Sequence, residues 1–191
     1  MRIVGGQLKG RTLMSPKGRG LRPTADQVRE SIFNILTHGI DGCTLKDTAV
    51  IDVFCGTGAL GLEAISRGAK HCLFIDLDAV ALGYVRKNAG SMGLDSEVIM
   101  LKLDAQRFPK FPKVFKYPVA VAFLDPPYNK GLAGIALLSL KEKGWLKPGA
   151  FCVVEIAAQE IFNIPKDFSL INERKFGAAR VAFLRFDSPY R

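Results

Sequence analysis

The sequence predicts an α/β protein whose doubly wound, mostly parallel seven-stranded sheet ends in an antiparallel hairpin. Three observations support this fold class. Short apolar runs alternate with segments of helical periodicity from about residue 47, glycines stand where those helices would end (Gly68, Gly93 and Gly144), and the last two apolar runs are joined by a turn. At 191 residues and 48% hydrophobic content, the chain can enclose one substantial core but not two large domains.

The expected elements follow from this alternation. Apolar runs rich in β-branched residues predict strands near 49–54, 71–76, 97–103, 119–125 and 150–156, and the segments between them predict helices near 58–67, 78–92 and 131–143. Residues 168–175 and 180–186 flank a turn that contains Gly177, which predicts the closing hairpin. An antiparallel end is compatible with a mixed doubly wound sheet.

Residues 1–40 precede this alternation and predict a small extension to a main domain that we place at residues 41–191. The segment 2–13 alternates around paired glycines, which is typical of a short hairpin outside the main sheet. Thr24 and Gln27 have the spacing of a capping box, and apolar residues then recur at helical spacing until Gly39. We therefore expect a hairpin, a loop over 15–20 and a helix over 25–38.

Composition argues against several classes of protein. No apolar stretch approaches the roughly 20 residues that cross a bilayer, and the first residues lack the apolar segment of a secretory signal. The four cysteines are scattered without C-x-x-C spacing and the chain has two histidines, so neither a zinc site nor a disulfide framework is indicated. We expect a cytoplasmic monomer with reduced thiols, no metal and no membrane partner.

Basic residues are concentrated at the start of the chain. The protein has 27 Lys and Arg against 18 Asp and Glu, a net charge of +9, and residues 1–24 hold six basic residues and no acidic one. This concentration predicts contact with a polyanion, whereas the plainer alternative is a solvated basic arm. A second basic cluster over 102–116 is interleaved with phenylalanines, which we expect to close the core rather than to stack on bases.

A glycine-rich turn, Gly56-Thr57-Gly58-Ala59-Leu60-Gly61, lies between the predicted strand at 49–54 and the next helix. Such glycines let the backbone approach a ligand closely, and Asp76, which ends the following strand, is placed to accept hydrogen bonds from ribose hydroxyls. These features suit a nicotinamide dinucleotide and other nucleoside cofactors alike. The alternative without a ligand is a turn used only for packing.

A second motif, Asp125-Pro126-Pro127-Tyr128, follows the predicted strand at 119–125. Two consecutive prolines fix the backbone and remove two N–H donors, which leaves carbonyl acceptors beside the Asp125 carboxylate. Acceptors of this kind suit an exocyclic amino group, and Tyr128 offers a flat face on which an extruded base can stack. Hydride transfer has no use for this arrangement, although an isolated motif of this kind also occurs as a rigid turn.

The two motifs in this order resemble the Rossmann-like class I S-adenosylmethionine-dependent methyltransferases that modify amino groups. More specifically, the segments 2–11 and 21–34, and the match that continues through Gly61-Leu62-Glu63-Ala64, resemble the bacterial 16S ribosomal RNA guanine-N2 methyltransferase family. The resemblance covers nearly the whole chain. It implies methyl transfer from S-adenosylmethionine to a guanine N2 of 16S rRNA within the assembled or assembling small ribosomal subunit, with residues 1–40 contacting the RNA.

The resemblance also implies roles for particular residues. Asp52, Gly56 and Gly58 would form the methionine end of the cofactor site, Asp76 would bind the ribose and Asp104 would receive the adenine amino group; Asp125 and the Pro126 carbonyl would hold the guanine amine under Tyr128. The complete predicted sets are Asp52, Phe54, Gly56, Gly58, Asp76, Leu77, Asp104 and Ala105 for the cofactor, Asp125, Pro126, Pro127 and Tyr128 for catalysis, and Lys9, Arg11, Arg19, Arg22 and Arg29 for RNA.

Other functions remain open at this point. A DNA adenine-N6 methyltransferase shares the Asp-Pro-Pro-Tyr motif, but it ordinarily needs a separate target-recognition region for which the first 40 or so residues offer little room. A dinucleotide-dependent oxidoreductase explains the glycines and leaves the basic arm unexplained. A non-catalytic RNA-binding protein with a decayed methyltransferase fold is disfavoured because none of the expected functional positions is missing.

Overall fold

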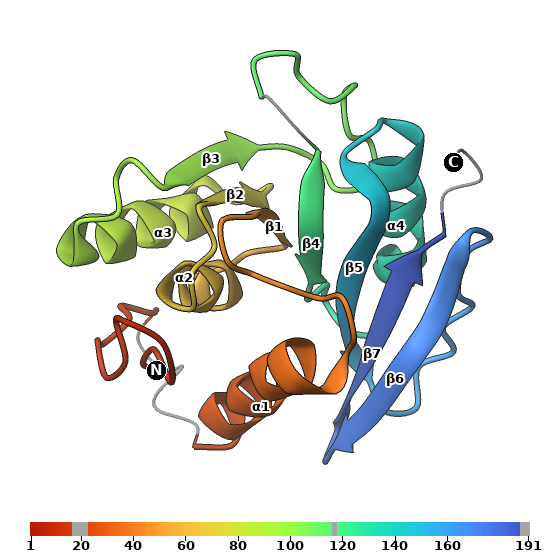
Figure 1. Cartoon of the computed structure of the whole chain (residues 1–191), viewed down its shortest axis with the longest axis horizontal. Coiled ribbons are helices and arrows are strands. Elements are labelled where there is room, and N and C mark those ends of the chain that lie inside the picture. The colour runs from red at the N-terminus through yellow and green to blue at the C-terminus, as the bar shows by residue number, and fades with distance from the viewer. Residues whose placement is uncertain (17–22, 116–117, 188–191) are drawn as a thin grey trace.

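The computed structural model describes residues 1–16, 23–115 and 118–187. Its centre is a seven-stranded sheet with the order β3-β2-β1-β4-β5-β7-β6 (Figure 1). The strands are β1 (Ala49–Val53), β2 (His71–Asp76), β3 (Val98–Lys102), β4 (Val119–Leu124), β5 (Leu146–Ala157), β6 (Phe168–Phe176) and β7 (Ala179–Phe186). The helices are α1 (Pro23–Asn34), followed by a π-helical turn (Ile35–Gly39), α2 (Ala59–Ser66), α3 (Ala79–Met92) and α4 (Leu132–Glu142).

The predicted fold class is confirmed. Strands β1 to β5 pair in parallel, and β7 pairs antiparallel with both β5 and β6. The strand order reverses direction at β1, which lies between β2 and β4. Ligands of doubly wound sheets lie outside the carboxyl ends of the strands at such a reversal, so the fold itself points to the ends of β1 and β4.

Two apolar layers cover the sheet. One joins Phe74 and Phe123 of the sheet to α1, α2 and α3, through residues such as Phe33, Leu62 and Val85. The other packs α4, Trp145 and the segment after β3 on the opposite face, and includes Phe108 with Phe111 and Phe115 at its border. These three phenylalanines close the core, as predicted from their interleaving with basic residues.

Three expected boundaries differ from the structure. Helix α1 begins at Pro23 rather than near residue 25, because proline suits the first helical position, where its missing N–H and fixed φ cost nothing. The helix continues into a π-helical turn that ends at Gly39. The side chain of Thr24, which was predicted to cap the helix start, is outside the described part of the structure. Strand β5 begins at Leu146 rather than near 150, because a register shift against β4 keeps a stretch with proline and glycine within the strand.

The N-terminal segment lies outside the main sheet as predicted. It folds back on itself through an antiparallel bridge between Arg2 and Thr12 and through backbone hydrogen bonds such as that from the Ile3 N–H to the Arg11 carbonyl. Its glycines permit a very close approach to α2: a Cβ at Gly6, whose φ is +75°, would lie 1.9 Å from the Ser66 carbonyl oxygen. Ile3 and Leu13 are buried in the same apolar layer as α1 and the sheet. The N-terminal segment is therefore anchored in the main core through Ile3 and Leu13. The division into an extension and a main domain at residue 40 remains a prediction about their roles.

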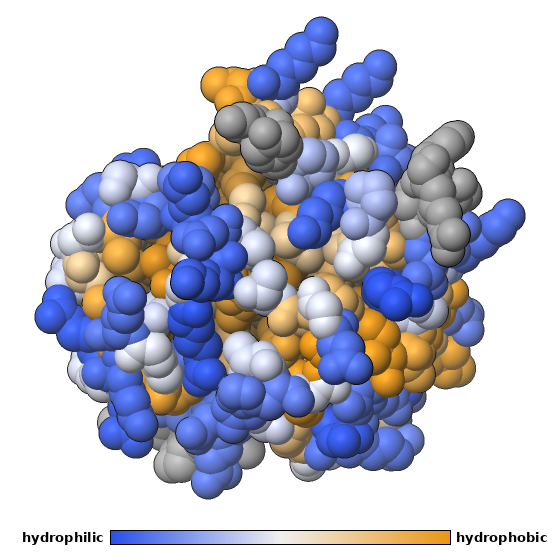
Figure 2. Space-filling view, viewed as in Figure 1, coloured by the Kyte–Doolittle hydropathy of each residue, from blue (hydrophilic) through white to orange (hydrophobic). Residues whose placement is uncertain are grey.

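Hydrophobic side chains are unevenly distributed over the surface of the molecule (Figure 2). Figure 2 shows hydrophobic side chains gathered toward the side of β6 and β7, where Leu170 and Ile171 are partly exposed. None of the helices within the described ranges is both long and apolar enough to cross a membrane.

Candidate nucleotide-cofactor and amine site

Two backbone N–H groups of the glycine-rich turn after β1 donate hydrogen bonds to carboxylates. The Gly61 N–H donates to Asp52 Oδ2 at 2.8 Å, and the Gly56 N–H donates to Asp76 Oδ2 at 3.0 Å. Phe54 has a φ of +61°, a left-handed conformation that is uncommon for an aromatic residue and stores backbone strain at the start of the turn. Strain at a strand end that faces a ligand crevice is typical of a functional turn.

The three glycines of the turn have different physical roles. A Cβ at Gly61 would lie 2.4 Å from the Phe74 ring, so this position must be glycine for α2 to pack on β2. Gly58 has a φ of +80° and is also crowded by Phe74. Gly56 has a φ of +52°. Apart from its chain neighbours, the described residues place no heavy atom within 4 Å of the position that a Cβ would take there, so the surroundings of Gly56 are open to a ligand.

Asp52 is the electrostatic centre of this region. Its side chain is only 1% exposed, and burial raises the pKa of its carboxyl well above the usual value of 3.8. The Gly61 N–H opposes this shift in pKa, whereas the charges of Asp125 and Asp76 reinforce it. The site therefore favours a ligand that brings positive charge to these carboxylates.

The neighbouring strand ends supply the other predicted cofactor residues. Asp76 closes β2, and its Oδ1 accepts a hydrogen bond from the Asp78 N–H at 2.9 Å. Asp104 follows β3 and accepts from the Gln106 N–H at 2.9 Å. Leu77 is 58% exposed beside Asp76, whereas Ala105 is buried. Two carboxylates at neighbouring strand ends, with an accessible apolar side chain next to Asp76, fit the polar and flat surfaces of a nucleoside.

Cys55, within the turn, is buried. Burial raises the pKa of its thiol, and the charges of Asp52 and Asp76 raise it further. The thiol stays protonated and acts as a small packing group, since the thiolate is the nucleophilic form. Among the described residues, no group of three or more His, Cys, Asp and Glu side chains is arranged to hold a metal ion.

The Asp-Pro-Pro-Tyr turn leaves β4 directly beside this crevice. The Asp125 N–H reaches the Val53 carbonyl at 3.4 Å, which joins the turn to the end of β1. Pro126 is buried, and Tyr128 is 39% exposed. The Tyr128 hydroxyl donates to Glu155 Oε1 at 2.6 Å, and burial, together with this carboxylate, raises the pKa of the phenol. The ring is thereby held at the rim of the site.

Two acidic residues that the sequence analysis missed, Glu155 and Glu160, hold this turn. Glu160 Oε2 accepts from the Asn129 N–H at 2.7 Å, and its Oε1 accepts from the Gly131 N–H at 3.4 Å. The Glu160 carbonyl is in turn bonded by Arg180 at 2.7 Å. A signal for Glu155 existed, because it lies near the carboxyl end of a parallel strand as Asp76 does. Glu160 lies in an irregular segment and had no such signal.

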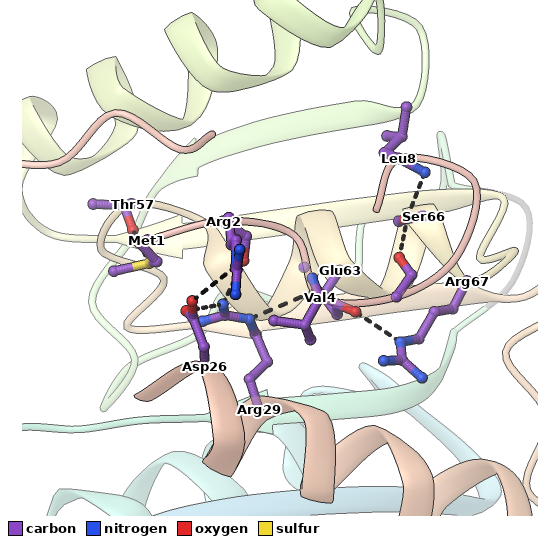
Figure 3. Close-up of polar contacts among 12 residues, drawn as sticks. Met1, Arg2, Val4, Leu8, Asp26, Arg29, Thr57, Glu63, Ser66 and Arg67 are labelled. Atoms are coloured by element: carbon purple, nitrogen blue, oxygen red, sulfur yellow. Dashed lines mark hydrogen bonds and ion pairs between the residues drawn. The ribbon is translucent and has the colours of Figure 1, made fainter. Parts of the chain in front are cut away.

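The predicted RNA-contacting residues fall into three groups. Lys9 and Arg11 are exposed on the N-terminal hairpin, and Arg11 Nη2 bonds the Ser91 carbonyl at the end of α3. Arg19 and Arg22 lie outside the described residues. Arg29 is 5% exposed, with its guanidinium 2.7 Å from Asp26 and 3.7 Å from Glu63 (Figure 3). Because it is committed to internal carboxylates, Arg29 is withdrawn from the RNA-contacting set.

Glu63 on α2 is the centre of this buried network. It is fully buried, and its oxygens accept from Arg67 Nε and from the Val4 N–H, both at 2.8 Å (Figure 3). A second buried side chain, Asn88 on α3, bonds both Met14 and the Thr57 carbonyl of the glycine turn. The N-terminal segment is therefore attached to the same helix and turn that shape the cofactor crevice.

Known proteins resemble this chain over nearly its whole length. A family model described as Conserved hypothetical protein 95 matches residues 1–185. Ribosomal RNA small subunit methyltransferase D of Haemophilus influenzae is 35% identical over 181 residues, which covers 93% of this chain and 89% of that protein. The Escherichia coli K12 protein of the same name is 34% identical, covering 93% and 85%. A putative rRNA methyltransferase of Bacillus subtilis, YlbH, is 32% identical, covering 97% and 98%.

Solved structures agree with the sequence comparison. A putative methyltransferase from Escherichia coli, yhhF, superposes with a TM-score of 0.80 at 28% identity, and a putative methylase from Haemophilus influenzae with a TM-score of 0.78 at 29% identity. Each match covers 98% of both chains. The match of the family model over nearly the whole chain, together with these relatives, places the protein in the family of ribosomal RNA small subunit methyltransferase D.

Proposed function

We propose that this protein transfers a methyl group from S-adenosylmethionine to the exocyclic N2 of a guanine in 16S rRNA. The observation that carries the proposal is the meeting of the glycine turn and the Asp-Pro-Pro-Tyr turn, which the hydrogen bond between Asp125 and Val53 joins at the reversal of strand order. One turn suits a nucleoside cofactor and the other suits an amino group. The names of the relatives, ribosomal RNA small subunit methyltransferases, support the same reaction class.

The charge of the crevice favours this donor over a dinucleotide. Burial raises the pKa of Asp52, and the charges of Asp125 and Asp76 raise it further. The anionic pyrophosphate of a nicotinamide dinucleotide would add negative charge to this group of carboxylates and would be disfavoured. S-adenosylmethionine instead carries a sulfonium and an ammonium group. Asp52 and Gly56 would hold its methionine end, Asp76 its ribose hydroxyls and Asp104 its adenine amino group. When bound, the cofactor supplies a methyl group that is already activated.

The remaining chemistry is positioning of the amine. Asp125 and the Pro126 carbonyl accept hydrogen bonds from N2, which orients its lone pair toward the methyl carbon and stabilises the positive charge that develops on nitrogen. Asp125 then receives the amine proton, directly or through water. The Tyr128 ring, fixed through its hydroxyl by Glu155, supports the extruded guanine by stacking.

The RNA-binding surface of this proposal is centred on the N-terminal hairpin. Lys9 and Arg11 are exposed, and the hairpin is anchored through Glu63 to the helix that follows the glycine turn. Phosphates bound by this hairpin would therefore be held at a fixed distance from the crevice. The expected substrate is the assembled or assembling small ribosomal subunit, and the proposed location is the cytoplasm.

The decisive experiment is transfer of tritiated methyl groups from S-adenosylmethionine to small-subunit particles, naked 16S rRNA and DNA in parallel. We expect label in the ribosomal substrates, recovered after nuclease digestion as N2-methylguanosine. Label recovered in N6-methyladenine of DNA would replace the proposed substrate with the adenine alternative. Tight NADH binding without methyl transfer would instead favour the oxidoreductase.

A further inference from the structure

Glu155 lies next to Asp125 across the strand pair β4–β5. The β4–β5 register pairs Leu124 with Val154, so the next residues along the two strands are Asp125 and Glu155. Phe123 and Val153, two residues earlier, belong to the apolar layer on the α1 face. Because side chains alternate along a strand, Asp125 and Glu155 follow on that same face, on strands about 4.8 Å apart.

The Glu155 carboxylate has one oxygen engaged and one open. Its Oε1 accepts the Tyr128 hydroxyl at 2.6 Å. Its Oε2 has no hydrogen-bond partner within the described part of the chain and is not among the buried unpaired atoms. A carboxylate oxygen with access to solvent therefore lies between the residue proposed to hold the target amine and the ring proposed to stack on the base.

The bases differ in what they would present to such an acceptor. In guanine the N1–H donor lies beside the N2 amino group, so two neighbouring atoms both donate. In adenine the atom beside the N6 amino group is N1, which has a lone pair and no hydrogen. A carboxylate next to the amine-binding residue thus attracts guanine and repels adenine.

We infer that Glu155 accepts the N1–H of the target guanine and determines the choice of guanine over bases that present an unprotonated nitrogen there. This inference rests on the proposed function and adds a specificity-determining residue to it. Hydrogen bonds to a charged partner discriminate strongly, because a base that lacks the donor leaves the carboxylate desolvated and unpaired.

The test compares guanine with 2-aminopurine, which keeps the 2-amino group but has an unprotonated N1. After the methylated guanine has been located, 16S rRNA is ligated with either base at that position, and kcat/KM and RNA affinity are measured for both. We expect the natural protein to favour guanine by about 10- to 100-fold. In Glu155→Gln the side-chain amide donates to N1 of 2-aminopurine, so this preference should fall to about one or reverse.

Two further variants make the outcome specific. Tyr128→Phe removes the hydrogen bond from the Tyr128 hydroxyl to Glu155 and should keep the preference for guanine. Glu142→Gln, at an exposed position of α4, should leave kcat/KM unchanged for both guanine and 2-aminopurine. Equal ratios in the natural protein and Glu155→Gln, or the same collapse in Tyr128→Phe, would overturn the inference. If Glu155→Gln is inactive, the affinity ratio decides in its place. A natural protein that fails to methylate guanine RNA contradicts the proposed function itself, which is a distinguishable result.

Discussion

Two buried carboxylates, Glu63 on α2 and Asp52 on β1, have opposite surroundings. Glu63 is fully buried, contacts Arg67 at 2.8 Å and Arg29 at 3.7 Å, and also accepts the Val4 N–H. Asp52 is 1% exposed, accepts the Gly61 N–H, and lies near the like charges of Asp125 and Asp76. The charge of Glu63 is thus balanced by the protein's own arginines, and we call Glu63 the completed carboxylate. Asp52 instead faces further carboxylates, as expected where a cationic ligand binds, and we call it the incomplete carboxylate.

Removing the completed carboxylate should have the largest effect on stability. Glu63→Ala leaves the buried guanidinium of Arg29 and the largely buried guanidinium of Arg67 without their shared partner. Breaking a buried ion pair in this way costs about 3–5 kcal/mol. Urea unfolding should show this loss, while Glu30→Ala on the exposed side of α1 should stay close to the natural protein. A loss below about 1 kcal/mol would mean that the network contributes no more than a surface ion pair.

Asp125→Ala should have the largest effect on the reaction. Its proposed contacts are to the amine and strengthen as charge develops, so kcat should fall by about 10²–10³-fold while S-adenosylmethionine still binds. Single-turnover methylation and calorimetric titration separate these two effects. Normal methylation at saturating RNA would remove Asp125 from catalysis, and loss of cofactor binding would make it part of the cofactor site.

The contrast also explains which parts of the molecule were predictable from sequence. The positions of most strands and helices, the closing hairpin and the two turns at the ends of β1 and β4 follow from local patterns of apolar residues, glycines and prolines. Arg29 was assigned wrongly because a basic residue near the start of a helix looks the same whether it faces solvent or a buried partner. That partner, Glu63, lies on another helix, and no local pattern connects them.

Other features depend on contacts that local sequence does not encode. Glu160 holds the turn after Tyr128 only because the segment following β5 folds back over it, as its bond to the Asn129 N–H records. The early start of β5 depends on a register shift against β4, and Pro148-Gly149 by itself indicates a turn. Such features are set by packing between elements rather than by the pattern within one.

Changing the incomplete carboxylate should separate binding from stability. Asp52→Asn keeps an oxygen that can accept the Gly61 N–H but removes the charge. We expect S-adenosylmethionine affinity to fall about tenfold or more, equivalent to about 1.4 kcal/mol, and the melting temperature of the cofactor-free protein to rise. Calorimetry and thermal unfolding measure the two effects, and lower stability with unchanged affinity would show that Asp52 is a structural residue.

The same carboxylate predicts a pH dependence. Because the folded-state pKa of Asp52 is raised, its contribution to stability is fully present below the unfolded value near 3.8 and is lost as pH rises through the raised folded-state pKa. A cationic ligand favours the ionised form, so cofactor affinity should increase with pH over that window and binding should release protons. Asp52→Asn should abolish this part of the pH dependence, which titration in buffers of different ionisation enthalpy can measure.

The smallest expected effect concerns the exposed charges of the N-terminal hairpin. If Lys9 and Arg11 contact phosphates, replacing both with alanine should weaken RNA binding several-fold and reduce the slope of log affinity against log salt by roughly 1.4, since fewer counterions are released. Methylation at saturating RNA should change less. A Lys166/Lys175 double alanine variant, which removes the same charge from exposed positions far along the chain, is the matched control.

The quadruple variant Lys9/Arg11/Arg19/Arg22→Ala extends this test to the two arginines outside the described residues. A further decrease in slope would assign phosphate contacts to that loop as well, because the control corrects for the general effect of net charge. A slope equal to that of the control would mean that the hairpin is only a solvated basic surface. The RNA would then have to be bound by the exposed cations beside the crevice, of which Lys102, Arg107 and Lys130 are the first to replace. That result would break the link between the Glu63 anchor and RNA positioning while leaving the cofactor site of Asp52 intact.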